Sequence, residues 1–171
     1  MIRIYASLTA IVFLATAACA TQSGALGSRT EEALLRALDD ERHAQAIYQA
    51  VMDRHGEIRP FSNIIRAEER HELFLLDLFK KYEVAVPQDP WPARALEAPD
   101  TVRESCAQAV EAEKANLDMY DELLELVEEP DIRDIFKRLR DASKERHLPA
   151  FKRCSESNRG RGRGDRGRGY E

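Results

Sequence analysis

Apolar side chains recur every three or four residues along four stretches of the chain, which is the spacing of one face of an α-helix. The stretches cover about residues 30–55, 60–82, 101–128 and 131–154. Pro149 lies inside the fourth stretch and should bend that helix, because proline lacks a backbone N–H donor. The pattern therefore predicts an all-α domain over residues 28–156.

Residues at the ends of these stretches support the predicted helices. Ser28 and Glu31 have the spacing of a capping box before the first helix. Gly56 is a typical helix stop. Thr101 and Glu104 predict a second capping box at the start of the third helix.

The connections between the stretches predict the topology. The first and second helices, and the third and fourth, are joined by only a few residues, so each pair should form an antiparallel hairpin. The middle connection, EVAVPQDPWPARALEAPD (residues 83–100), is far longer. At about 3.3 Å per extended residue it can run the length of a helix of about 37 Å. Two hairpins joined by one long crossover form a ferritin-like four-helix bundle.

Ionisable residues interrupt the apolar face of every predicted helix. The interruptions are Glu41, Glu68, His71, Glu113 and His147. A lone buried carboxylate is costly, whereas several donors placed around one cation share that cost. Glu68 and His71 are three residues apart, so both can face the same ion. The pattern indicates a mono- or dinuclear site for iron or manganese, and zinc would also accept these donors.

An internal repeat strengthens the metal-site interpretation. DDERHAQAIYQAV aligns with VEAEKANLDMYDEL, and in each segment a tyrosine follows a glutamate by seven residues. The pairs are Glu41 with Tyr48 and Glu113 with Tyr120. The tyrosines are either hydrogen-bond donors behind the metal ligands or ordinary core residues, and the spacing leaves both readings open.

The fourth helix departs from the full two-metal pattern. Bundles with two metals use Glu-x-x-His on two helices, but Lys144 stands three residues before His147. The donor set is therefore one carboxylate short. The alternative reading is a metal-free bundle that retains a salt-bridged remnant of the site and acts as a binding or structural module in the cell envelope.

Three segments carry a family resemblance: DDERHAQAIY, FSNIIRAEERH and DASKERHLPAF. They resemble the signature blocks of a prokaryotic ferritin-like family described as a domain of unknown function, over about residues 30–154. The resemblance implies the same five positions as metal ligands, and the family shares the missing second Glu-x-x-His. With dioxygen or peroxide, an iron centre of this kind could perform oxidase or ferroxidase chemistry, although the resemblance itself implies no reaction.

The first 20 residues have the features of an export signal. Arg3 precedes the apolar run IYASLTAIVFLA, which is too short to span a bilayer comfortably, and small residues follow it. Cleavage after Ala20 would give a soluble periplasmic protein. TAAC also resembles a lipobox, in which case Cys19 would be lipidated and would anchor the protein to a bacterial membrane.

The last residues, 157–171, alternate mainly between arginine and glycine and predict a disordered tail. Five arginines against Asp165 and Glu171 make this tail basic, whereas the body is acidic. The tail could solubilise the protein or touch an anionic membrane surface. Export argues against nucleic acid as its partner.

Two cysteines have matching positions around the predicted site. Cys106 lies seven residues before Glu113, and Cys154 lies seven residues after His147. Because the third and fourth helices are antiparallel, both cysteines should lie at the same height on the inward face. We therefore expect a disulfide in an oxidising compartment, with two packed thiols as the alternative. Cys19 would then be left for the lipid.

Overall fold

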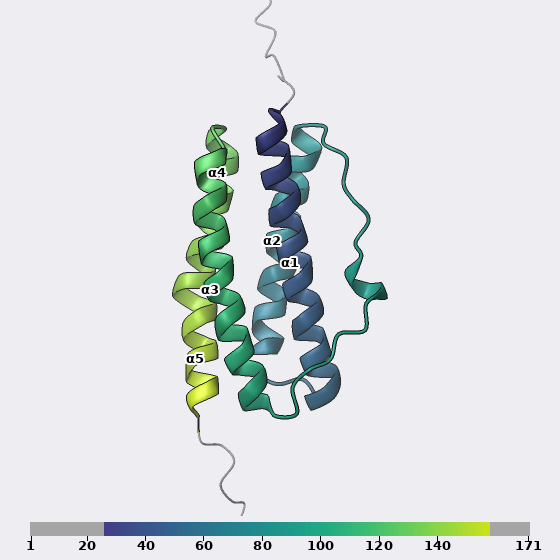
Figure 1. Ribbon diagram of the computed structural model, residues 1–171, viewed down its shortest axis with the longest axis vertical. Helices are drawn as coiled ribbons and strands as arrows, with labels where there is room; N and C mark the ends of the chain where they lie inside the picture. Colours follow the sequence, from purple (N-terminus) through teal and green to yellow (C-terminus); the bar gives the residue numbers. More distant parts are fainter. Residues whose placement is uncertain (1–25, 158–171) are drawn as a thin grey trace, which may run out of the picture.

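Four helical rods form the part of the chain that the computed structural model describes, residues 26–157 (Figure 1). The rods are α1 (Ser28–His55), α2 (Phe61–Lys81), α3 (Val102–Leu126), and a fourth made of α4 (Pro130–Ala142), the π-helical turn η2 (Ser143–His147) and α5 (Leu148–Glu156). No strand occurs between residues 26 and 157. The predicted export signal with Cys19 and the tail beyond residue 157 lie outside the described residues.

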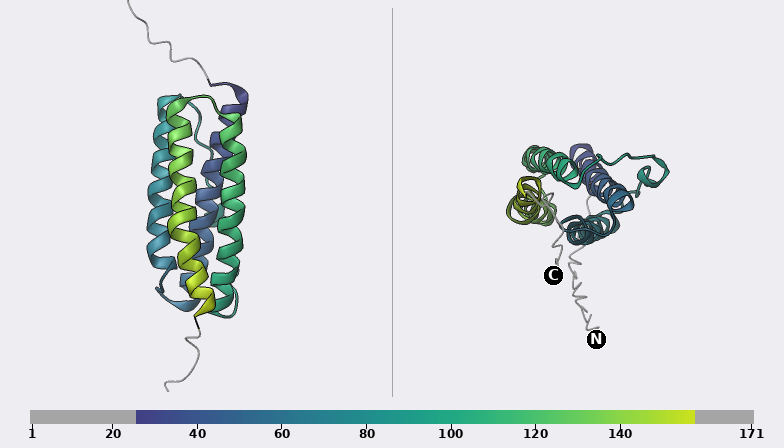
Figure 2. Two further views of the ribbon diagram at one scale, coloured as in Figure 1. Left: turned by 90° about the vertical axis from the view of Figure 1, so that its left-hand side faces the viewer. Right: turned by 90° about the horizontal axis from the view of Figure 1, so that it is seen from below.

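The long connection between α2 and α3 runs along the outside of α1, from one end of the bundle to the other (Figures 1 and 2). As a result α2 and α3 are parallel, and the two short connections make antiparallel hairpins. This arrangement confirms the ferritin-like fold predicted from the loop lengths. None of the helices in residues 26–157 is long and apolar enough to cross a membrane.

Polar and aromatic contacts fix the crossover to α1. The ring of Trp91, in the short 3-10 helix η1 (Trp91–Ala93), stacks on His43 with 3.9 Å between ring centroids. Its indole N–H donates to Asp39 Oδ1 over 2.9 Å. Arg42 donates to the Pro87 carbonyl oxygen at 3.0 Å. The proline-rich segment is thus held against one face of α1 at several points.

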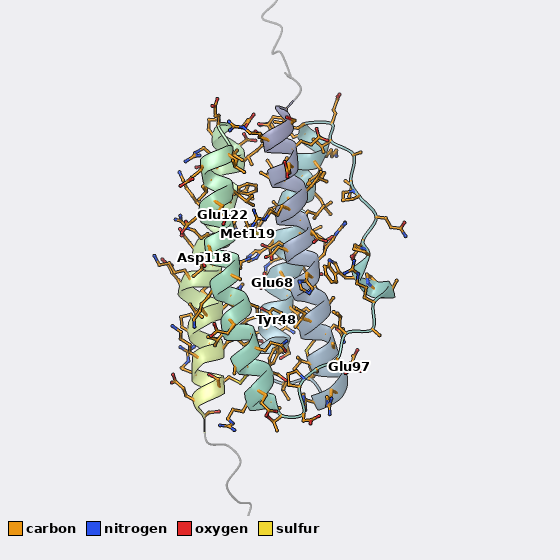
Figure 3. All side chains as sticks on the ribbon, viewed as in Figure 1. Tyr48, Glu68, Glu97, Asp118, Met119 and Glu122 are labelled. Atoms are coloured by element: carbon orange, nitrogen blue, oxygen red, sulfur yellow. A yellow bond between two sulfur atoms is a disulfide. The ribbon has the colours of Figure 1, made fainter. Side chains whose placement is uncertain are left out.

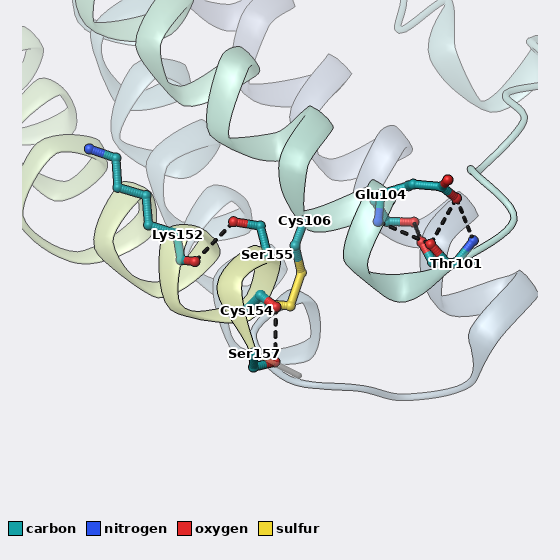
Figure 4. The surroundings of a disulfide bond; sticks show 8 residues. Thr101, Glu104, Cys106, Lys152, Cys154, Ser155 and Ser157 are labelled. Atoms are coloured by element: carbon teal, nitrogen blue, oxygen red, sulfur yellow. Dashed lines mark hydrogen bonds between the residues drawn. A yellow bond between two sulfur atoms is a disulfide. The ribbon is translucent and has the colours of Figure 1, made fainter. Parts of the chain in front are cut away.

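The ends of the helices follow the sequence signals with one exception. Thr101 and Glu104 form the reciprocal capping box of α3 (Figure 4), and Gly56 ends α1 at a φ of 83° that favours glycine. The capping box predicted at Ser28 is wrong. The Glu31 N–H bonds to the carbonyl oxygen of Gly27, so Gly27 is the N-cap and Ser28 is already helical.

The fourth rod is interrupted before the proline that was expected to bend it. Pro149 has no N–H to offer, and the backbone widens into the π-helical turn just ahead of it, where the Leu148 N–H donates to the Ser143 carbonyl oxygen. The wide turn leaves both its ends, Ser143 and His147, buried and exposes the three residues between them. The turn thereby sets which side chains of this rod face the centre.

The apolar core consists of two clusters at different heights of the bundle. One cluster contains Leu34, Leu38, Phe79 and Phe136, and the other contains Tyr48, Phe61, Cys106 and Phe151. Buried polar residues of all four rods lie between these clusters along the helices. Apolar side chains therefore cover the predicted site toward both ends of the bundle.

A disulfide joins Cys106 of α3 to Cys154 of α5, the pairing that the sequence spacing predicts (Figure 4). The two Cα atoms are 5.8 Å apart, and the cross-link spans a sequence separation of 48 residues. It ties the two chain segments together at the end of the hairpin opposite its turn.

The double substitution Cys106→Ser/Cys154→Ser should lower the free energy of unfolding by about 4 kcal/mol, because a loop of this length loses its constraint in the unfolded chain. Denaturant unfolding of the oxidised protein and the variant measures this difference. A reductant should destabilise the wild type and leave the variant unchanged. Two free thiols at these positions, found by mass spectrometry without reductant, would contradict the bridge.

Candidate metal centre

Glu68 of α2 lies at the centre of the buried polar layer, about midway along the bundle (Figure 3). Its Oε2 atom is 2.8 Å from Nδ1 of His71, one helical turn away on the same helix. Its Oε1 atom is 3.0 Å from Nδ1 of His147 in the π-helical turn. One carboxylate therefore presents one oxygen to each imidazole.

A second carboxylate flanks each imidazole. Glu41 of α1 approaches His71 Nδ1 at 3.2 Å, and Glu113 of α3 approaches His147 Nδ1 at 3.6 Å. The two imidazole rings are nearly parallel, with 5.6 Å between centroids. All five predicted residues are 2–7% exposed. The four rods thus bring together two sets of donors that share Glu68.

The tyrosine of each repeat segment donates a hydrogen bond to the flanking carboxylate of the other segment. Tyr120 of α3 donates to Glu41 Oε1 of α1 at 2.6 Å, and Tyr48 of α1 donates to Glu113 Oε1 of α3 at 2.7 Å. Burial raises the pKa of both phenols well above the ordinary value, and the nearby carboxylates add to this effect. Both tyrosines therefore remain hydrogen-bond donors.

Burial and proximity shift the pKa of the clustered groups in opposite directions. Burial, followed by the charge of Glu68, raises the pKa of Glu41. Burial acts to raise the pKa of Glu68 as well, but the contacts with His147 and His71 outweigh it and lower that pKa. Burial opposes protonation of the imidazoles, yet the carboxylates raise the pKa of His71 to about 9 and that of His147 to about 10. A metal ion that binds these rings must therefore compete with protons for the ring nitrogens.

Two features of the cluster suit a metal ion: the chemical type of its donors and a buried ring nitrogen that has no hydrogen-bond partner in the described residues. Carboxylate and imidazole together suit iron, manganese and zinc. His147 Nδ1 is fully buried and has no hydrogen-bond partner within residues 26–157. Its 3.0 Å contact with Glu68 lacks hydrogen-bond geometry and is therefore purely electrostatic. One subset of the cluster, Glu68, His71 and His147, offers three ligand atoms within 4.8 Å of one another.

A cavity of about 180 Å³ between α1 and α3 reaches the cluster and contains polar residues that the sequence pattern did not predict. It is lined by Glu41, Glu68 and Glu113, and also by residues that were not predicted: Asp40, Asn116 and Ser143. Asn116 donates to Asp40 Oδ2 at 2.6 Å. Burial raises the pKa of Asp40 to about 6, against the hydrogen bond from Asn116, and repulsion from Glu68 and Glu113 adds to the increase.

Ser143 occupies the place where the sequence pattern expects a further carboxylate. In the π-helical turn the residue that shares the buried face with His147 is four positions earlier, not three, so Lys144 points outward and Ser143 points inward. Pro149 was the available signal, because a proline two residues after His147 favours a distorted turn. Asp40 carried a weaker signal, the acidic pair that it forms with Asp39 just before Glu41.

A four-helix bundle with one crossover and a central carboxylate–imidazole cluster defines the ferritin-like class. Residues 32–154 match the family described as Rubrerythrin, so the chain belongs to the rubrerythrin family, whose domains bind iron. The fold is similar to the crystal structure of hypothetical protein MJ0754 from Methanococcus jannaschii DSM 2661. The identity is 17%, the TM-score is 0.67, and the match covers 76% of this chain and 81% of that chain. No protein of curated function matches the sequence.

The metal-free protein should lose stability as the pH rises from 7 to 10. The folded state raises the pKa of both imidazoles from 6.5 to about 9 and about 10, so their contribution is complete below about pH 6.5 and disappears as they lose protons. Thermal unfolding after chelator treatment measures the decline. His147→Gln should make the decline smaller, whereas His55→Gln, outside the cluster, should leave it intact. A melting temperature constant from pH 7 to 10 would contradict the assignment.

Proposed function

We propose that this protein binds two ions of iron or manganese in one carboxylate centre. The observation that supports this most directly is the placement of Glu68, with one oxygen toward each imidazole. Glu41 and His71 would hold one ion, Glu113 and His147 would hold the other, and Glu68 would be shared. The missing sixth ligand, at the position that Ser143 occupies, leaves space beside the centre for a small molecule.

Bound iron would supply electron transfer to dioxygen or peroxide, which supports an oxidase or ferroxidase activity. The residues of this chain prepare that site in three ways. Tyr48 and Tyr120 fix the orientation of the flanking carboxylates through their hydrogen bonds. The two apolar clusters limit the access of water from above and below. The cavity between α1 and α3 reaches the carboxylates and has room for several water molecules or for dioxygen.

We propose further that the protein works after export, either free in the periplasm or anchored through a lipid on Cys19. The support is the predicted export signal together with the Cys106–Cys154 bridge. Structural disulfides persist mainly in oxidising compartments. The basic tail would add a weak attraction to anionic membrane surfaces.

Elemental analysis after anaerobic loading with Fe²⁺ or Mn²⁺ tests the centre. The wild type should retain two equivalents after gel filtration and oxidise Fe²⁺ when oxygen is admitted. Glu68→Ala should retain less than one equivalent and lose the oxidation, because both ions lose their shared ligand. Glu69→Ala, an exposed neighbour on the same helix, should behave as the wild type.

Three other results of that analysis would overturn all or part of the proposal. Retention of a single equivalent would contradict a dinuclear centre and leave a mononuclear one. A protein that stays metal-free would support the alternative of a structural or binding module in the envelope. Normal metal content without Fe²⁺ oxidation would leave the centre in place and remove the ferroxidase activity.

Tyr120→Phe should weaken the binding of Zn²⁺, used as a redox-inactive probe, by about 10–100-fold, because Glu41 loses the hydrogen bond that orients it. Chelator competition measures this affinity. Tyr82→Phe is a matched control, since Tyr82 also donates to a carboxylate, that of Asp131, but outside the centre. Equal affinities for all three proteins would show that Tyr120 is only a core residue.

A further inference from the structure

A second and larger cavity touches the centre from the opposite side of the bundle. This groove has a volume of about 580 Å³ and lies between α2 and the fourth rod. Both imidazole residues, His71 and His147, line it, whereas none of the three clustered glutamates does. The groove and the small cavity between α1 and α3 therefore reach different edges of the same cluster.

The orientation of the two imidazoles determines what they can offer to this groove. Nδ1 of His71 and of His147 is turned toward the glutamates, so the ring edge that remains for the groove carries Nε2. An imidazole that binds a metal through Nδ1 keeps its proton on Nε2, so Nε2 of such a ring can donate a hydrogen bond. The two rings line the groove with 5.6 Å between their centroids.

Three arginines surround these donors: Arg70, Arg138 and Arg146. None of them forms an ion pair within residues 26–157. Arg138 lies over the ring of Phe74, with its guanidinium carbon 4.2 Å from the ring centroid. A guanidinium group has planar donors that match carboxylate and phosphate oxygens, and stacking on an aromatic ring fixes the plane of Arg138.

The carboxylates along the groove do not cancel this positive charge. Asp141 is bound by Arg140, at 3.1 Å, and Arg140 also contacts Asp121. Glu145 is the remaining acidic residue of the lining, and it is exposed. Three guanidinium groups therefore stand against one carboxylate that has no partner in the described residues.

The rest of the lining is apolar and comes from both rods, including Ile64, Ala67, Phe74, Ala142 and Ala150. A volume of about 580 Å³ exceeds what a bare inorganic ion needs and lies in the range of sites for small organic ligands. The groove thus offers charged donors for one end of a molecule and apolar walls for its body.

We propose that this groove binds a small organic anion with a carboxylate or phosphate group. The anionic oxygens accept hydrogen bonds from Arg138 and Arg146 beside the Nε2 edges of His71 and His147, and the carbon skeleton packs against the apolar wall. The proposal goes beyond the metal centre, because the arginines that hold the anion are not among the candidate metal ligands.

Calorimetric titration of the full-length protein with succinate and with phenyl phosphate tests the site and separates the two anion classes. The uncharged succinamide is the neutral probe. Binding of at least one anion and no binding of succinamide is expected, in chelator-treated and in zinc-loaded protein alike. Equal anion affinity in chelator-treated and zinc-loaded protein would show that anion binding does not require the metal centre.

The double substitution Arg138→Gln/Arg146→Gln should weaken anion binding by about tenfold or more, because it removes two charge-assisted hydrogen-bond donors. Lys137→Gln/Lys144→Gln removes the same charge from neighbouring exposed positions that do not line the groove, and it should change the affinity less than twofold. Nitrogen-resolved imidazole spectra should shift for His71 and His147 on anion addition, and not for His43 or His55.

Three results would overturn the proposal. The first is the absence of binding for both anions. The second is an equal loss of affinity in the two double variants, which would show a general charge effect. The third is binding that leaves the spectra of His71 and His147 unchanged, which would place the anion elsewhere on the surface.

Discussion

The shared position of one buried carboxylate, Glu68, between two imidazoles is the constraint on which the rest of this structure depends. The ring centroids of His71 and His147 are 5.6 Å apart, and the surrounding carboxylates raise the pKa of both imidazoles. At an effective dielectric constant of 20, two unit charges at that distance repel by about 3 kcal/mol. Glu68 offsets this repulsion by contacting both rings, and a metal pair would replace the protons while keeping the same carboxylate at the centre.

The surroundings of the cluster compensate for the burial of five ionisable groups, which costs several kcal/mol for each unpaired charge. Every flanking carboxylate has a tyrosine donor, and each tyrosine comes from the opposite member of the α1–α3 repeat. Apolar clusters extend from the polar layer toward both ends of the bundle. The disulfide then fixes the end of the α3–α5 pair that has no connecting turn.

The centre has two sides of different character. The cavity between α1 and α3 touches the carboxylates and is acidic, with Asp40 beside Glu41. The groove between α2 and the fourth rod touches the outer edges of the imidazoles and is lined by arginines. Acidic side chains line the first side and three arginines line the second, so the two approaches to one buried cluster differ in charge.

The sequence by itself determined the four rods, their connectivity and the five polar residues that meet at the centre. Helical periodicity and loop length are local properties, and a residue that interrupts an apolar face must be buried wherever that face packs. Only the tertiary structure decided how these residues meet: the crosswise pairing of Tyr48 and Tyr120, and the position of Ser143 in a widened turn. The spacing of residues along a helix shows which side they face, but not which residue of another helix lies opposite. The arginine groove likewise forms between two rods that are far apart in the chain, α2 and the fourth rod. Helical periodicity in the sequence does not show which helices pack side by side, so the groove could not be predicted from it.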